Sequence, residues 1–119
     1  MQIDICPSNL LLLPEHSLRI TRRVGFALSR LSARIRRVEV RLTDVNGPRG
    51  GDDKRCRVLL HLDGGGWMLV EDRGADLPGL IDRTIDRARR VAHKRIGQLK
   101  QARHSPRTAR TAEDLITAG

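Results

Sequence analysis

The clearest pattern along this chain is the strict alternation of apolar and polar residues in two segments, 37–43 and 54–62. Successive side chains of a strand point to opposite faces of a sheet, so alternation predicts strands with one buried face and one face in water. Two shorter segments, 2–6 and 67–71, are also predicted to be strands. The inward positions of the two longer strands are Val38, Val40, Leu42, Cys56, Val58, Leu60 and Leu62.

Two longer segments repeat their apolar residues with helical spacing, the first from about 15 to 33 and the second from 76 to 101. Pro14 suits a first helical turn, whereas Gly25 costs about 1 kcal/mol relative to Ala inside a helix. Phe26 projects from the polar side of the first helix. Its side chain has two alternatives, packing on a neighbouring helix or partial exposure to solvent. The expected buried stripes are Ile20, Val24, Ala27, Leu28 and Leu31, then Leu77, Ile81, Thr84, Ile85, Ala88, Val91, Ala92 and Leu99.

The order of these elements is β-α-β-β-β-α, and the fold class predicted is α+β, a four-stranded sheet with two helices packed on one face. The other face of the sheet then stays open to water and carries candidates such as Arg37, Arg41, Arg55 and Arg57. A length of 119 residues suits a single domain, expected over 1–102. Residues 44–53 are rich in turn formers, and residues 103–119 read as a flexible basic tail.

Positive charge gives the first indication of function. The chain has 23 Lys and Arg residues against 14 Asp and Glu residues, a formal net charge of +9. Such a balance favours nucleic acid as a partner. An anionic membrane is the other candidate, but Phe26 and Trp67 are too few aromatic residues for an inserting face, and no apolar run is long enough to span a bilayer.

The second helix carries a row of cations spaced four, three and four residues apart, which places them within an arc of roughly 60°. We call Arg83, Arg87, Arg90 and Lys94 the cation row. A rigid line of positive charge suits a polyphosphate, and the alternative is a solvated surface that serves solubility. With so few aromatic residues, we expect binding through phosphates and shape rather than base stacking, and affinity that falls steeply with salt.

The residues do not support an enzyme, a metal site or a cofactor. The four histidines are scattered without metal-ligand spacing, and Cys6 and Cys56 form no C-x-x-C pair, so both are expected to be reduced thiols in or beside strands. The glycine-rich segment 47–51 lacks the Gly-Lys-Ser/Thr ending of a phosphate-binding loop. Asp86 is expected to pair with Arg90 rather than to act as a catalytic carboxylate.

Three segments together resemble one family, the ribosome hibernation promoting factors and ribosome-associated translation inhibitors, also described as sigma-54 modulation proteins. They are the opening Met-Gln-Ile-Asp-Ile, the strand, loop and strand over 38–57, and Asp-Leu-Pro-Gly-Leu-Ile-Asp at 76–82 before the basic helix. The resemblance covers about the first hundred residues. Relatives usually have Tyr where this chain has Pro78, so the local contact of that ring is in doubt, although proline fits a first helical turn.

This resemblance implies a short-form cytoplasmic protein that binds small-subunit rRNA in the mRNA and tRNA channel and inhibits translation on idle ribosomes. It is expected to be a monomer off the ribosome, with no membrane or small-molecule partner. Two alternatives remain, a general RNA- or DNA-binding module on the same fold and a divergent relative that acts by binding a protein. In that family the basic residues of the last helix contact rRNA, and Arg87, Arg90 and Lys94 match their positions; Arg83 joins them through its place in the cation row. The resemblance also implies contacts from Arg22, Arg23, Lys54, Arg55 and Arg57.

Overall fold

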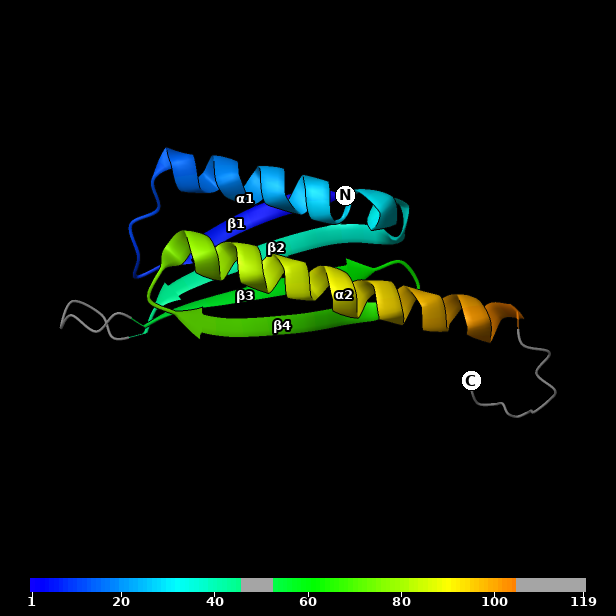
Figure 1. Ribbon diagram of the computed structural model, residues 1–119. Coiled ribbons are helices and arrows are strands. Elements are labelled where there is room, and N and C mark those ends of the chain that lie inside the picture. Colours follow the sequence, from blue (N-terminus) through cyan, green and yellow to red (C-terminus); the bar gives the residue numbers. More distant parts are fainter. Residues whose placement is uncertain (46–52, 105–119) are drawn as a thin grey trace.

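The computed structural model describes residues 1–45 and 53–104, with side chains described as far as Leu99. The predicted order β-α-β-β-β-α is confirmed (Figure 1). No helix in this part of the chain is both long and apolar enough to cross a membrane. The elements are β1 (Gln2–Ser8), α1 (Pro14–Ala27), the 3-10 helix η1 (Ser29–Arg34), β2 (Ile35–Asp44), β3 (Lys54–Leu62), β4 (Gly66–Gly74) and α2 (Leu77–His104).

The four strands form one sheet in the order β1-β2-β3-β4, with β1 parallel to β2 and the other neighbours antiparallel. The register places Ile5 beside Val40, Val40 beside Val58 and Val58 beside Val70, so an aliphatic row crosses the whole sheet. Both helices lie side by side on this apolar face (Figure 1). The predicted α+β fold class is therefore confirmed.

The core lies between the helices and the inward side chains of the sheet, which are buried as predicted in β2 and β3. On α2 the buried stripe differs from the prediction at its margins. Leu80 and Ile96 are buried, Leu99 is half-buried, and Val91 is 40% exposed. Val91 lies on the flank of α2 that faces β4, and because β4 is the outermost strand, no further strand extends beneath it.

Several element boundaries also differ from the prediction. The first helix ends at Ala27, earlier than position 33, and the chain continues as η1. β1 continues through Pro7 to Ser8, past its predicted end at position 6; a proline is tolerated there because β1 is an edge strand of the sheet. The second helix reaches His104 rather than 101. Residues 46–52 of the predicted loop and 105–119 of the predicted tail lie outside the described residues.

Local contacts explain where the helices begin. The Asp76 carboxylate accepts a hydrogen bond from the backbone N–H of Gly79 (3.1 Å), one of the N–H groups that a helix start leaves without a partner. Pro78 occupies the first turn of α2, as predicted, where its missing N–H costs nothing. At α1, Pro14 is the first residue, and the backbone N–H of Leu13 donates to Nδ1 of His16 (3.3 Å).

The turn between β3 and β4 contains three glycines, and two of them are required by its backbone. Gly64 and Gly66 adopt φ values of +75° and +70°, a region that L side chains rarely adopt. Gly65 lies against α2, and a Cβ there would lie 2.8 Å from Cδ1 of Leu99, the far end of a side chain that can shift to make room. The turn therefore allows α2 to pass directly over this end of the hairpin.

Leu59 and Leu60 are adjacent in β3 but point to opposite faces, which makes them a matched test of the core. Leu60 is fully buried and Leu59 is only half-buried on the face away from the helices. Leu60→Ala should lower the free energy of unfolding by about 2–5 kcal/mol, and Leu59→Ala by about 1 kcal/mol or less. Urea unfolding measures both, and equal losses would contradict this orientation of the sheet.

Candidate nucleic-acid interface

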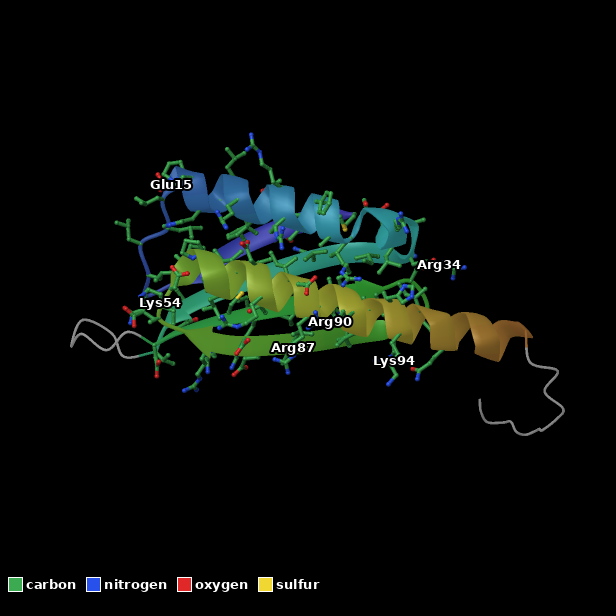
Figure 2. All side chains as sticks on the ribbon, viewed as in Figure 1. Glu15, Arg34, Lys54, Arg87, Arg90 and Lys94 are labelled. Atoms are coloured by element: carbon green, nitrogen blue, oxygen red, sulfur yellow. The ribbon has the colours of Figure 1, made fainter. Side chains whose placement is uncertain are left out.

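The cation row lies along α2 from its second turn onward, and Figure 2 shows Arg87, Arg90 and Lys94 in succession on that helix. All four side chains are exposed, but their surroundings differ. Arg83 donates through Nε to the Asp72 carboxylate (2.8 Å) and through Nη2 to the carbonyl oxygen of Arg73 (2.9 Å). Arg83 therefore fastens the start of α2 to the end of β4, and a neighbouring carboxylate offsets its charge.

Further along α2, two cations have no ion pair among the described residues, although the charge of Arg87 still acts on the Asp72 carboxylate. Arg87 donates to the backbone carbonyl oxygen of Glu71 (3.1 Å), an acceptor without a full negative charge. Within residues 1–45 and 53–104, no carboxylate lies within ion-pair distance of Arg87 or Lys94. Arg90 forms the predicted ion pair with Asp86 (2.5 Å), which confirms that interpretation of Asp86. Free positive charge on the cation row is therefore centred on Arg87 and Lys94.

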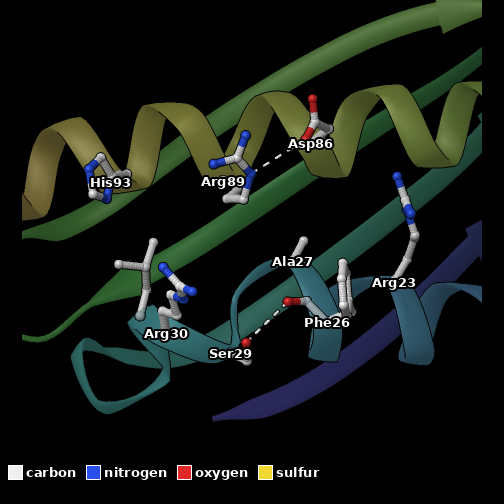
Figure 3. A pocket seen from close by; sticks show the side chains of 9 residues that line it. Arg23, Phe26, Ala27, Ser29, Arg30, Asp86, Arg89 and His93 are labelled. Carbon is white, nitrogen blue, oxygen red and sulfur yellow. Dashed lines mark hydrogen bonds and ion pairs between the residues drawn. The ribbon is translucent and has the colours of Figure 1, made fainter.

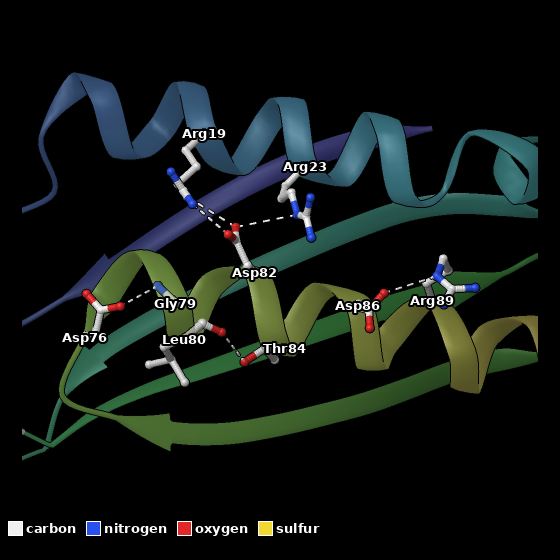
Figure 4. Close-up of polar contacts among 9 residues, drawn as sticks. All are labelled: Arg19, Arg23, Asp76, Gly79, Leu80, Asp82, Thr84, Asp86 and Arg89. Atoms are coloured by element: carbon white, nitrogen blue, oxygen red, sulfur yellow. Dashed lines mark hydrogen bonds and ion pairs between the residues drawn. The ribbon is translucent and has the colours of Figure 1, made fainter.

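The two candidate arginines of α1 have different surroundings. Arg22 is exposed on the outer side of the helix. Arg23 turns toward α2, where its Nε lies 3.5 Å from Oδ1 of Asp82, and Arg19 contacts the same carboxylate at 2.6 Å (Figure 4). Asp82 therefore links the two helices through ion pairs. Arg23 contributes positive charge and also helps to hold α1 against α2.

The three candidates on β3 do not join the cation row. Arg55 and Arg57 alternate with buried Cys56 and Val58, so they lie on the open face, the side of the sheet away from the helices. Arg37 and Arg41 share that face, as predicted. Arg57 pairs with Glu71 (3.0 Å), Arg37 with Asp4 (2.6 Å) and Arg41 with Glu39 (2.9 Å).

Lys54 lies at the start of β3, at the opposite end of the molecule from Arg34 (Figure 2). The open face also carries an aromatic pair, in which the rings of His61 and Trp67 stack with centroids 4.7 Å apart. The predicted site residues thus occupy two faces and one end of the molecule rather than a single surface.

A pocket between the two helices was not predicted as a site. We call it the interhelical pocket; it has a volume of about 560 Å³ and is open on one side (Figure 3). Sequence patterning had placed Phe26 on the polar side of the first helix, but it could not bring Arg89 and His93 of α2 beside it. The lining residues are Arg23, Phe26, Ala27, Ser29, Arg30, Leu31, Asp86, Arg89 and His93.

Groups that could perform metal or thiol chemistry are not brought together. In the part of the chain that the structure describes, no three His, Cys, Asp or Glu side chains are placed to hold a metal ion. Cys6 and Cys56 are free and lie in β1 and β3, as predicted, with Cys6 exposed and Cys56 buried. Burial raises the pKa of the Cys56 thiol to about 11.

No protein-family model and no curated protein sequence matches this chain. Among solved structures, the fold is similar to that of the Protein Y N-terminal domain from Thermus thermophilus, with a TM-score of 0.63 and 22% identity over 79% of this chain and 98% of that one. It is also similar to a ribosomal subunit interface protein from Coxiella burnetii, with a TM-score of 0.66 and 11% identity over 79% of this chain and 96% of that one. At these identities the likeness establishes the shared fold, which is the fold that the sequence resemblance implied.

The contact between Asp72 and Arg83 should give stability a measurable pH dependence. Hydrogen bonds from the Arg83 side chain and then from the Arg73 backbone N–H lower the pKa of the Asp72 carboxyl. A carboxyl with a lowered pKa stabilises the fold above its unfolded pKa of about 3.9, and this contribution is lost as the pH falls through the folded pKa. Asp72→Asn should therefore lower the free energy of unfolding at neutral pH by about 0.2–1 kcal/mol, a small effect because both side chains are partly exposed.

The difference between Asp72→Asn and the wild type should shrink below about pH 4, and urea unfolding across pH measures it. Arg83→Gln provides the matched control. In the double variant, the loss in free energy of unfolding should be smaller than the sum of the losses in the two single variants. A pH-independent difference, or strict additivity, would contradict an ion pair between these two side chains.

The thiols should differ sharply in reactivity. Because the thiolate is the reactive form, iodoacetamide at about pH 8 should alkylate exposed Cys6 and leave buried Cys56 unmodified in the folded protein. In denaturant both should react, which controls for intrinsic reactivity. Peptide mass spectrometry distinguishes the two sites, and equal rates under native conditions would contradict the burial of Cys56.

Proposed function

We propose that this protein binds the small ribosomal subunit and inhibits translation there as a hibernation factor. The observation that carries the proposal is the exposed positive charge of Arg87 and Lys94 on α2, which have no ion pair among the described residues, in a fold shared with a ribosomal subunit interface protein. The sequence resemblance to hibernation and translation-inhibition factors supports the same function. The protein would act as a monomer in the cytoplasm, with rRNA in the mRNA and tRNA channel as its partner.

Phosphate contacts would supply most of the affinity. Arg87, Arg90 and Lys94 lie on one helix that is held rigidly against the sheet, so they can follow a phosphate backbone without ordering a flexible segment. Arg22 would add a contact from α1. Lys54, Arg55 and Arg57 lie at the end and on the open face of the sheet, where only a partner that surrounds the protein could reach them as well.

A channel lined with rRNA has this surrounding shape. Specificity would then come from the fit of a folded protein into a folded RNA, rather than from base-specific hydrogen bonds. A protein seated in the channel would exclude mRNA and tRNA by volume, so the mechanism needs no catalytic group. Asp76 and Pro78 build the start of α2 without the aromatic ring that relatives usually carry, and binding would rely on the later turns of the helix.

Co-sedimentation with purified small subunits across a salt series tests this proposal. The double variant Arg87→Glu/Lys94→Glu should weaken binding. It should also reduce the steepness of log affinity against log salt concentration by about 1 to 2, because binding releases fewer counterions when phosphate contacts are lost. A double variant on the open face, Arg41→Glu/Arg73→Glu, changes the net charge equally and should weaken binding less than the α2 variant does. Circular dichroism controls for folding of both variants.

Three other outcomes would count against the proposal. Equal losses in the two variants would indicate binding to bulk charge, and equal affinity for naked duplex RNA would favour a general nucleic-acid module. Failure of the wild type to bind small subunits, together with a stable protein partner, would favour a divergent relative that acts through protein binding. A cell-free translation assay then determines whether bound protein blocks synthesis.

A further inference from the structure

We propose that the interhelical pocket binds a single nucleotide, with the base stacked on Phe26 and the phosphate held by Arg30 and Arg89. This site is separate from the β4-facing side of α2, where Arg87 contacts a strand carbonyl. The pocket lies on the other flank of the helix, toward α1 and η1 (Figure 3). The inference goes beyond ribosome binding and does not depend on it.

Phe26 is the first reason for assigning a nucleotide. It is the only phenylalanine in the chain, and it lies on α1 at the rim of the pocket with 80% of its surface exposed. It contributes little to the core from this position. A planar ring presented to solvent beside cations is a surface on which a base can stack, and stacking tolerates any base because each has a π face.

The charges of the pocket provide the second reason. Arg30 is exposed, and within the described residues no carboxylate lies within ion-pair distance of it. Arg89 contacts Asp86 at 3.4 Å, but Asp86 is shared with Arg90, so the single carboxylate of the pocket does not neutralise the cations around it. Figure 3 shows Arg89 on α2 and Arg30 on the η1 side of the pocket, with the Arg89 side chain turned toward Asp86. A phosphate between the two walls would be reached by both guanidinium groups if Arg89 turned from Asp86 toward it.

Size and composition distinguish a nucleotide from simpler ligands. A volume of about 560 Å³ is in the range of pockets that take small organic ligands and is larger than an inorganic phosphate requires. An inorganic anion would also leave Phe26 without a role. The shared chemistry, one base and one phosphate, could come from a free nucleotide or from an unpaired nucleotide of an RNA chain.

The experiment uses the single phenylalanine as a reporter. With ring-labelled phenylalanine, the NMR signals of the intact protein come from Phe26 alone, and titration with adenosine 5′-monophosphate (AMP) should shift them saturably. Trp67, the only tryptophan, lies on the open face and should show no change in fluorescence. Adenosine and inorganic phosphate serve as half-ligands, and each should bind more weakly than AMP.

Two pairs of variants separate the base contact from the phosphate contact. Phe26→Ala should weaken AMP binding, followed by backbone amide NMR signals, at least about fivefold, the lower end of what stacking supplies. Leu11→Ala removes an apolar side chain that is also 80% exposed but lies outside the pocket, and it should bind as the wild type does. Arg30→Gln should weaken the binding of AMP but not of adenosine, whereas Arg36→Gln, which lies outside the pocket, should change neither.

Comparing AMP with a short RNA distinguishes the two sources of the nucleotide. Saturable binding of AMP would assign a free nucleotide, and binding of a short single-stranded oligoadenylate alone, with the same dependence on Phe26 and Arg30, would assign an unpaired RNA nucleotide. No shift with either ligand, equal losses in Leu11→Ala and Phe26→Ala, or a response at Trp67 would overturn the proposal. Arg87→Glu/Lys94→Glu should bind AMP normally, so failure of this site and failure of ribosome binding are distinguishable.

Discussion

One constraint organises this protein: the sheet has a single apolar face, and that face has to be covered. Val40 lies between Glu39 and Arg41, and Val58 follows Arg57, so the aliphatic row they form is buried on one side only. Both helices therefore lie on the same side, parallel to the strands and next to each other (Figure 1). This arrangement creates three regions: the flank of α2 beside β4, the pocket between the helices, and the open face on the other side of the sheet.

Arginine side chains have different roles on the open face, between the sheet and the helices, and on the exposed helix surfaces. On the open face they pair with carboxylates, as Arg57 does with Glu71, which keeps an exposed sheet surface polar. Between the layers, Arg83 and Arg19 reach carboxylates on other elements and help to fix where α2 lies. Only in the remaining places, at residues such as Lys94 and Arg30, is positive charge left for a partner. The net charge of the chain does not reveal this division.

Sequence patterning predicted what depends on near neighbours. Alternation in β2 and β3, the periodicity of α2 and the pair between Asp86 and Arg90 all repeat within a few residues, and all are confirmed. The features that sequence patterning missed depend on how whole helices and strands are placed relative to one another. Periodicity gives the direction of the buried stripe on α2 but not the width of the sheet beneath it, so Val91 was misassigned. The contact of Arg19 with Asp82 spans 63 residues, and no local pattern encodes it.

The interhelical pocket was missed for the same reason, since it exists only where α1, η1 and α2 meet. A different consequence follows from the close approach of Leu99 to Gly65 at the β3–β4 turn. Beyond that point the strands end, while α2 continues to His104 (Figure 1). A helix end that extends past the sheet gains no stability from the strands, so the last turns should exchange amide protons faster than the turns above the sheet. A ligand bound along this end of α2 would slow that exchange, at the entropic cost of ordering the helix end.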